Sequence, residues 1–174
     1  MSVPRTAPSS LVVIATMLLF ASTLHAADVS MANGSVQFRT PDDWVDILDT
    51  QGDPEVHVFQ VPDSSPTGKV SLSRVTVTVK QVADMSAFQQ YVGTTSAKAL
   101  SLHGYKAAAV APGANTFVYT AQESGVQYSY SERYWFKNGL AVSLRCLRPS
   151  QSEAGPAWKA AFERGCDAVA AKLK

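Results

Sequence analysis

The stretch that decides the fold is Val126-Gln-Tyr-Ser-Tyr-Ser-Glu-Arg-Tyr-Trp-Phe-Lys-Asn-Gly-Leu-Ala-Val-Ser-Leu-Arg-Cys-Leu147. Large and small or polar residues alternate on both sides of Asn138-Gly139, as in strands that lay one face on a core. Asn-Gly favours a two-residue hairpin turn, because both turn positions need a positive φ. The stretch therefore predicts two antiparallel strands, 126–136 and 140–147, joined by a tight turn.

The turn also sets the register of this hairpin. Counting outward from it places Trp135 opposite Val142, Arg133 opposite Leu144, Ser131 opposite Cys146 and Glu132 opposite Arg145. One face then carries Leu140, Val142, Leu144 and Cys146, and the other carries Tyr128, Tyr130, Glu132, Tyr134, Phe136, Arg145 and Leu147.

A helix over residues 156–173 follows the hairpin. Its apolar positions are 158, 161, 162, 165, 166, 169, 170 and 173, which is helical spacing throughout. Pro156 suits the first turn of a helix, and Gly155 or Ser152 is the predicted cap.

The two cysteines connect the hairpin to this helix. Cys146 lies on the apolar face of the hairpin and Cys166 on the apolar stripe of the helix, so both point into one helix–sheet interface. We predict a disulfide between them, which closes a loop of roughly 20 residues and stabilises the fold by about 3 kcal/mol. A structural role is favoured over a redox or metal role, since neither a CxxC pair nor a neighbouring histidine is present.

Upstream of the hairpin the sequence predicts further strands and one more helix. The strands are 36–38, 44–48, 56–61, 70–80 and 116–122, and 62–68 is a Ser/Pro-rich loop. Apolar parity changes within 70–80, which predicts a bulge near Ser73 and Arg74. Asp84 caps a helix over 85–102 that ends at Gly104 and buries Met85, Phe88, Val92, Ala99 and Leu102.

These elements predict a single α+β domain over residues 27–174, with an antiparallel sheet of six to seven strands and helices on both sides. Residues 1–26 read as a signal peptide, because Arg5 precedes the apolar run 11–20 and Ala26 suits cleavage. That run is shorter than the roughly 20 residues of a membrane span, so no integral anchor is expected after cleavage. We predict a soluble periplasmic or secreted protein.

Charge argues against nucleic acid as a partner. Arg5 is the only ionised side chain of the leader, so one of the 15 basic residues is removed and the rest equal the 14 acidic ones. A balanced chain lacks the basic surplus that captures nucleic acid or an anionic membrane.

Two surfaces are candidates for binding a protein partner. The hairpin face with Tyr128, Tyr130, Glu132, Tyr134 and Arg145 either packs beneath the helix 85–102, with a Glu132–Arg145 pair across the strands, or forms an open aromatic surface. The segment 42–55 holds Asp42, Asp43, Asp46, Asp49, Asp53 and Glu55 without Lys or Arg. It is either a solvated acidic loop or a docking patch for a basic partner, and its spacing does not match a calcium-binding loop.

No catalytic, cofactor or metal motif occurs in the sequence. His57 and His103 lack metal-ligand spacing, and nucleophile-elbow, S-x-x-K, H-E-x-x-H and phosphate-loop patterns are absent. We therefore expect a non-enzymatic protein without cofactor. An enzyme would need Glu132, His57 or His103 to meet another polar group in a cleft.

Three segments give a family resemblance. Phe38-Arg-Thr-Pro-Asp-Asp-Trp44, Tyr134-Trp-Phe-Lys-Asn-Gly-Leu-Ala-Val142 and Trp158-Lys-Ala-Ala-Phe162 together resemble the PsbP-like family. The resemblance implies an antiparallel sheet with helices on both sides and a binding, scaffolding or assembly role, as in extrinsic photosystem subunits and bacterial envelope proteins. The 62–68 loop and the cysteine pair depart from the family pattern, and no family catalytic residue carries over.

The functional hypothesis is an exported binding or accessory protein of the cell envelope that acts through protein–protein contact. One alternative is a periplasmic immunity or inhibitor protein against a secreted toxin. Another is a small-ligand carrier, which needs a cavity of roughly 300 Å³ or more between sheet and helix.

Overall fold

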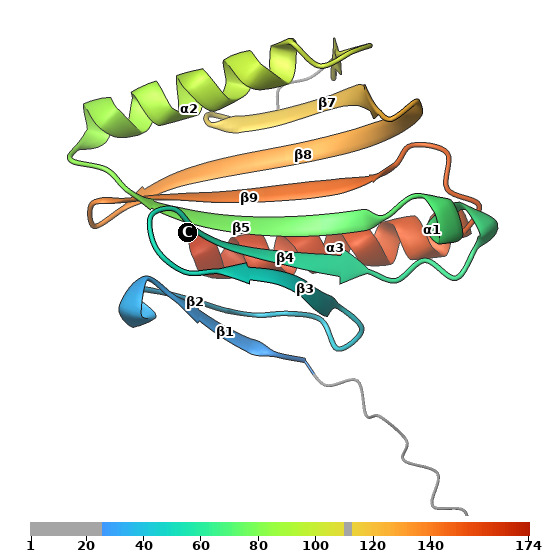
Figure 1. Cartoon of the computed structure of the whole chain (residues 1–174), viewed down its shortest axis with the longest axis horizontal. Coiled ribbons are helices and arrows are strands. Elements are labelled where there is room, and N and C mark those ends of the chain that lie inside the picture. The colour runs from blue at the N-terminus through green and yellow to red at the C-terminus, as the bar shows by residue number, and fades with distance from the viewer. Residues whose placement is uncertain (1–25, 110–112) are drawn as a thin grey trace, which may run out of the picture.

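The computed structural model of the chain describes residues 26–109 and 113–174 (Figure 1). Apart from Ala26, the predicted signal peptide lies outside these residues. In chain order the elements are β1 (Asp28–Met31), the single 3-10 turn η1 (Ala32–Gly34), β2 (Val36–Arg39), β3 (Val45–Thr50), β4 (Glu55–Val61), α1 (Pro66–Val70), β5 (Ser73–Gln81), α2 (Met85–Leu100), β6 (Lys106–Ala107), β7 (Thr116–Glu123), β8 (Val126–Lys137), β9 (Leu140–Pro149) and α3 (Gly155–Leu173).

Seven of these strands form one sheet in the order β3-β4-β5-β9-β8-β7-β6, with every pair antiparallel. Strands β1 and β2 pair separately. The predicted α+β class and sheet size are therefore confirmed. The sheet consists of two meanders, β3–β5 and β6–β9, which meet where β5 pairs with β9, and α2 carries the chain from the centre of the sheet to its far edge.

The hairpin that decided the fold has the predicted register. Ser131 faces Cys146, Glu132 faces Arg145 and Trp135 faces Val142. Asn138 and Gly139 both have positive φ, 50° and 77°, as the two-residue turn requires.

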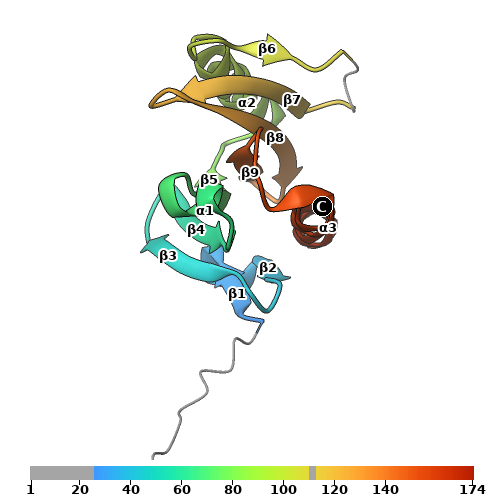
Figure 2. The same cartoon turned by 90° about the vertical axis from the view of Figure 1, so that its right-hand side faces the viewer.

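Helix α3 and the β1–β2 hairpin cover one face of the sheet (Figure 2). Fully buried side chains of β5, β9 and α3, including Val77, Leu144 and Val169, form the main core. The predicted disulfide between Cys146 and Cys166 is present, with Cα atoms 6.4 Å apart. It joins the middle of this face to the middle of α3.

Trp44, just before β3, packs against α3 because position 165 is glycine. A Cβ at Gly165 would lie 2.8 Å from Cζ2 of Trp44, closer than real Cβ contacts. The cap predicted for α3 was wrong, because the helix begins after Ala154 without a side-chain cap. Ser152 instead donates a hydrogen bond to Asp63 at 2.7 Å.

Helix α2 covers the other face, above β7 and β8 in Figure 1. Its predicted cap is confirmed, since the Asp84 carboxylate accepts a hydrogen bond from the backbone N–H of Ala87 at 2.8 Å. Phe88, Val92 and Ala99 are buried as predicted, whereas Met85 in the first turn is half exposed. Leu102 follows the helix, which ends at Leu100, and only partly packs beneath it.

The connection between β4 and β5 differs from the prediction. Residues 66–70 form the short helix α1, so the 62–68 segment is only partly loop. Val70 is the last residue of that helix and Leu72 precedes β5, so neither belongs to the strand. Both side chains are exposed. The bulge predicted near Ser73 and Arg74 is absent, because β5 starts at Ser73 and pairs without interruption on both sides.

Candidate functional site

The tyrosine face of the hairpin is closed by α2. Tyr128, Tyr130, Glu132 and Tyr134 are buried, with at most 6% of each residue exposed. Of the five residues predicted for this face, only Arg145 reaches solvent, with 45% of its side chain exposed. Of the two arrangements that the sequence left open, the structure has the covered one.

Glu132 is the centre of a hydrogen-bond network inside that face. Its Oε1 accepts from the hydroxyl of Tyr119 at 2.8 Å and from Nε of Arg145 at 2.6 Å. Its Oε2 accepts from the hydroxyl of Tyr134 at 2.7 Å. Both carboxylate oxygens are thus engaged within the fold, which is the role of a structural residue.

Burial and the charge of Glu132 raise the pKa of Tyr119 and of Tyr134 well above the usual tyrosine value. Burial also raises the pKa of Tyr130, whose hydroxyl donates to Glu123 at 2.8 Å. These phenols stay protonated donors at physiological pH. The sequence reading missed Tyr119, although its place on β7 in phase with Ala121 marks it as an inward residue.

The three groups on which an enzyme hypothesis rested each have polar neighbours, but none of them lines one of the hollows found in the described part of the chain. Glu132 belongs to the tyrosine network, and His103 contacts Gln122 with 2.6 Å between Nδ1 and Oε1. His57 is buried on β4 beside Asp46 and Asp49.

The acidic segment 42–55 is half strand and half turn. Asp46 and Asp49 lie in β3 and Glu55 begins β4, whereas Asp42, Asp43 and Asp53 lie in the turns before and after β3. The predicted strand 44–48 is confirmed as β3, which pairs with β4 although aspartate disfavours strands, so the segment is not one continuous loop. β3 is the edge strand of the seven-stranded sheet.

A bulge at Ile47 shapes this edge. The register shifts between Asp46 and Leu48, so one extra residue places Asp46 and Asp49 on the same side of β3. Both carboxylates then reach the His57 imidazole, with nitrogen–oxygen distances of 3.4 Å each. Nδ1 of His57 is within hydrogen-bond distance of Oδ2 of Asp46, whereas Nε2 has no aligned hydrogen bond.

The β3 edge also exposes apolar side chains. All six of its residues are exposed, and Val45, Ile47 and Leu48 are 42%, 43% and 49% exposed. In the described part of the chain, no Lys or Arg forms an ion pair with Asp42, Asp43, Asp46 or Asp49. We call residues 42–50 the acidic edge.

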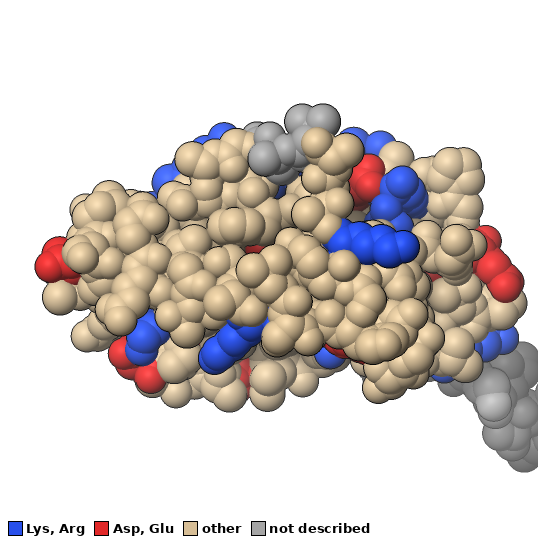
Figure 3. Space-filling model, turned by 90° about the horizontal axis from the view of Figure 1, so that it is seen from above, with Lys and Arg blue, Asp and Glu red and all other residues tan. Residues whose placement is uncertain are grey.

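Helix α2 offers a different surface. Lys98 is its only charged residue, and Figure 3, which looks down on this side, shows charges scattered over a mostly uncharged surface. The charge distribution on the α2 side therefore favours neither an acidic nor a basic partner.

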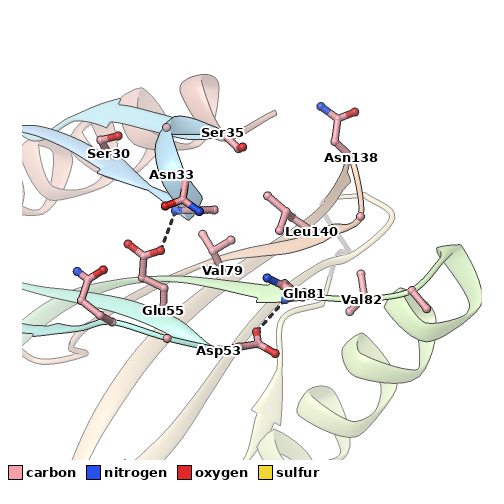
Figure 4. Close-up of a pocket in the computed structure, with 16 residues that line it drawn as sticks. Ser30, Asn33, Ser35, Asp53, Glu55, Val79, Gln81, Val82, Asn138 and Leu140 are labelled. Carbon is pink, nitrogen blue, oxygen red and sulfur yellow. Dashed lines mark hydrogen bonds between the residues drawn. The ribbon is translucent and has the colours of Figure 1, made fainter.

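A large hollow lies at one end of the sheet, where four connections meet (Figure 4). These are η1, the β3–β4 turn, the end of β5 and the β8–β9 turn. The hollow has a volume of about 900 Å³, and its polar wall groups are Ser30, Asn33, Ser35, Gln51, Asp53, Glu55, Gln81 and Asn138. We call it the end pocket. Two smaller hollows of about 290 Å³ and 320 Å³ border α3 and have the size expected of a carrier site between sheet and helix, but the end pocket is larger than either.

Three hydrogen bonds tie the walls of the end pocket together. Glu55 accepts from the backbone N–H of Ala32 at 2.7 Å, and Asp53 accepts from that of Gln81 at 2.8 Å (Figure 4). The backbone N–H of Val82 donates to the carbonyl of Gly139 at 2.9 Å. Turns far apart in sequence are therefore held in one arrangement. Single-sequence reasoning missed this pocket because only the tertiary fold brings these turns together.

The wall of the end pocket is polar and acidic. It has two carboxylates, amides and hydroxyls, and no Lys, Arg or His among the described residues that line it. The described residues also contain no group of three or more His, Cys, Asp or Glu side chains placed to hold a metal ion.

Comparisons with known proteins show the fold. No protein-family model and no curated protein sequence matches the chain. Among solved structures, the crystal structure of LpqN, involved in cell envelope biogenesis of Mycobacterium tuberculosis, superposes with a TM-score of 0.53 at 9% sequence identity. The match covers 83% of this chain and 86% of LpqN. The PsbP-like resemblance stays a prediction.

None of the helices in the described ranges is long and apolar enough to cross a membrane. The Cys146–Cys166 bond is of a kind that persists in oxidising compartments, which fits a periplasmic or extracellular location.

Proposed function

We propose that this protein is a non-enzymatic binding or accessory protein of the cell envelope, and that it holds a basic protein partner at the acidic edge. The observation that carries the proposal is the combination, on one edge strand, of exposed apolar side chains and aspartates that have no Lys or Arg partner among the described residues. Apolar contact supplies affinity in such an interface, and charge selects the partner and speeds association.

The form of the edge favours side-chain contacts over sheet extension. A bulge and charged side chains on an edge strand oppose the addition of a further strand, which also protects the free protein from aggregation. The partner is therefore expected to present Lys or Arg beside apolar residues to Ile47 and Leu48. The disulfide and the fold shared with an envelope protein support the compartment.

Site-specific photo-crosslinking in the exporting cell tests this function. A benzophenone amino acid at position 47 should give a defined adduct with a second protein, whereas the same group at position 100, exposed on α2, should not. Asp46→Asn/Asp49→Asn should reduce the adduct at least fivefold. The control Asp28→Asn/Asp167→Asn removes two exposed acids elsewhere and should leave the yield unchanged.

Two results would overturn the proposal. One is the absence of any adduct at position 47. The other is equal loss of adduct in the edge variant and the control, because the contact would then depend on total charge rather than on β3. His57 loses its acidic neighbours in the edge variant. Circular dichroism of both variants therefore checks that the sheet stays folded.

A further inference from the structure

The geometry points to a second binding site, independent of the acidic edge: we infer that the end pocket binds a small organic cation carrying an ammonium or guanidinium group. The decisive residue is Glu55 at the start of β4. Only 8% of it is exposed, yet its carboxylate forms part of the pocket wall (Figure 4).

The hydrogen bonding of Glu55 is half complete. Its Oε2 accepts from the backbone N–H of Ala32, while Oε1 has no hydrogen-bond partner among the described residues. No Lys, Arg or His in those residues forms an ion pair with it. Oε1 is not one of the fully enclosed polar atoms, so it faces the pocket, where a bound cation would pair with it.

The second acid of the pocket behaves differently. Asp53 lies 3.5 Å from Nζ of Lys80 and accepts from the backbone N–H of Gln81, so it already has a cation and a donor. The negative charge left for a ligand is therefore that of Glu55. This asymmetry places the cationic group of the ligand on the Glu55 side of the pocket, toward η1.

The rest of the wall suits the remainder of such a ligand. Side-chain amides of Asn33, Gln51, Gln81 and Asn138 supply both donors and acceptors, and Val79 and Leu140 supply apolar contact. A volume of about 900 Å³ is within the range of small-molecule sites and well above that of a single ammonium group. The ligand class is thus a cation with a polar body.

Titration of the ¹⁵N-labelled exported protein tests the site. Putrescine and ethylguanidinium serve as cations and 1,4-butanediol as the neutral control. The backbone amides of Ala32, Gln81 and Gly139 should shift saturably with both cations, with a Kd on the order of 1 mM for such small probes. The diol should bind at least tenfold more weakly.

Two variants locate the charge. Glu55→Gln keeps an acceptor for the Ala32 N–H and should weaken cation binding at least tenfold. Asp167→Asn removes the same charge from α3, outside both the pocket and the acidic edge, and should change the affinity less than twofold. Gln51→Lys, in an exposed part of the wall, places a cation in the pocket and should weaken binding at least fivefold even where Glu55→Gln does not fold.

A further arm separates the two sources of such a cation. The peptide acetyl-Ser-Lys-Ser-amide presents the ammonium group as a protein side chain, and binding of either the peptide or the free amines supports the site. Equal shifts with the diol, or unchanged affinity in both Glu55→Gln and Gln51→Lys, would overturn it. Because the readout is at η1 and the β8–β9 turn, its failure leaves the acidic edge proposal untouched, and the reverse also holds.

Discussion

The face of the sheet under α3 and the face under α2 share the strands β8 and β9 but differ in what holds them closed. Under α3 the contacts are apolar, and the Cys146–Cys166 bond adds a covalent link. Under α2 the apolar contacts form two smaller clusters on either side of the Glu132 network. One face is therefore closed by packing and a cross-link, and the other needs a set of matched polar groups.

This difference shows why the tyrosine face resembled a binding surface in sequence. Aromatic residues with one acid and one base are common at interfaces, but the same residues satisfy one another when a helix covers them. Whether a helix covers them depends on long-range packing that a strand pattern does not contain.

Removing the acid from the α2 face should have the largest effect. Glu132→Ala leaves the buried hydroxyls of Tyr119 and Tyr134 without their acceptor and creates a cavity, so we expect a loss of about 3–5 kcal/mol in the free energy of unfolding. Urea denaturation measures it. Glu132→Gln keeps an acceptor oxygen and should lose less. Equal losses in the two variants would contradict a hydrogen-bond role for the carboxylate.

On the α3 face the cross-link is the contact to remove. Cys146→Ala/Cys166→Ala should lower the free energy of unfolding by about 3 kcal/mol, since the bond closes a loop with a sequence separation of 20. Reduced wild-type protein serves as the control and should match the double variant under the same conditions. A variant as stable as the oxidised protein would show that α3 is held by packing alone.

The smallest expected effect is a pH dependence confined to the α2 face. Because the pKa of Tyr134 is raised in the folded state by burial and by Glu132, its stabilising contribution is complete below the unfolded tyrosine pKa near 10 and falls as pH rises above it. Wild type should be more stable than Tyr134→Phe, and this difference in the free energy of unfolding should shrink by about 1 kcal/mol per pH unit above pH 10. Urea denaturation at pH 8 and pH 11 measures this, and a constant difference would contradict it.

The sequence predicted those parts of the fold that depend on local signals. Asn138-Gly139 set the β8–β9 register, and the helical spacing of 158–173 placed Cys166 against Cys146. Asp84 marked the start of α2 correctly because an N-cap side chain bonds within its own turn.

The parts that failed depend on neighbours distant in sequence. Val70 and Leu72 have strand-like composition, but Pro66 starts a helical turn that leaves them exposed. The sequence predicted a strand over 44–48, but the bulge at Ile47, which turns Asp46 and Asp49 to the same side, leaves no clear mark in it. The candidate sites follow the same division: the acidic residues were found from composition, whereas the end pocket needs turns that only the assembled sheet brings together.

The joint between the two meanders has a consequence for how the chain folds. β5 and β9 are central neighbours, yet α2, β6, β7 and β8 all lie between them in sequence. Closing so long a loop is entropically costly, so this pairing is expected to limit the folding rate. Until β9 arrives, β5 presents a row of unpaired backbone groups beside Val75 and Val77, and the nascent protein is most vulnerable to aggregation at that stage.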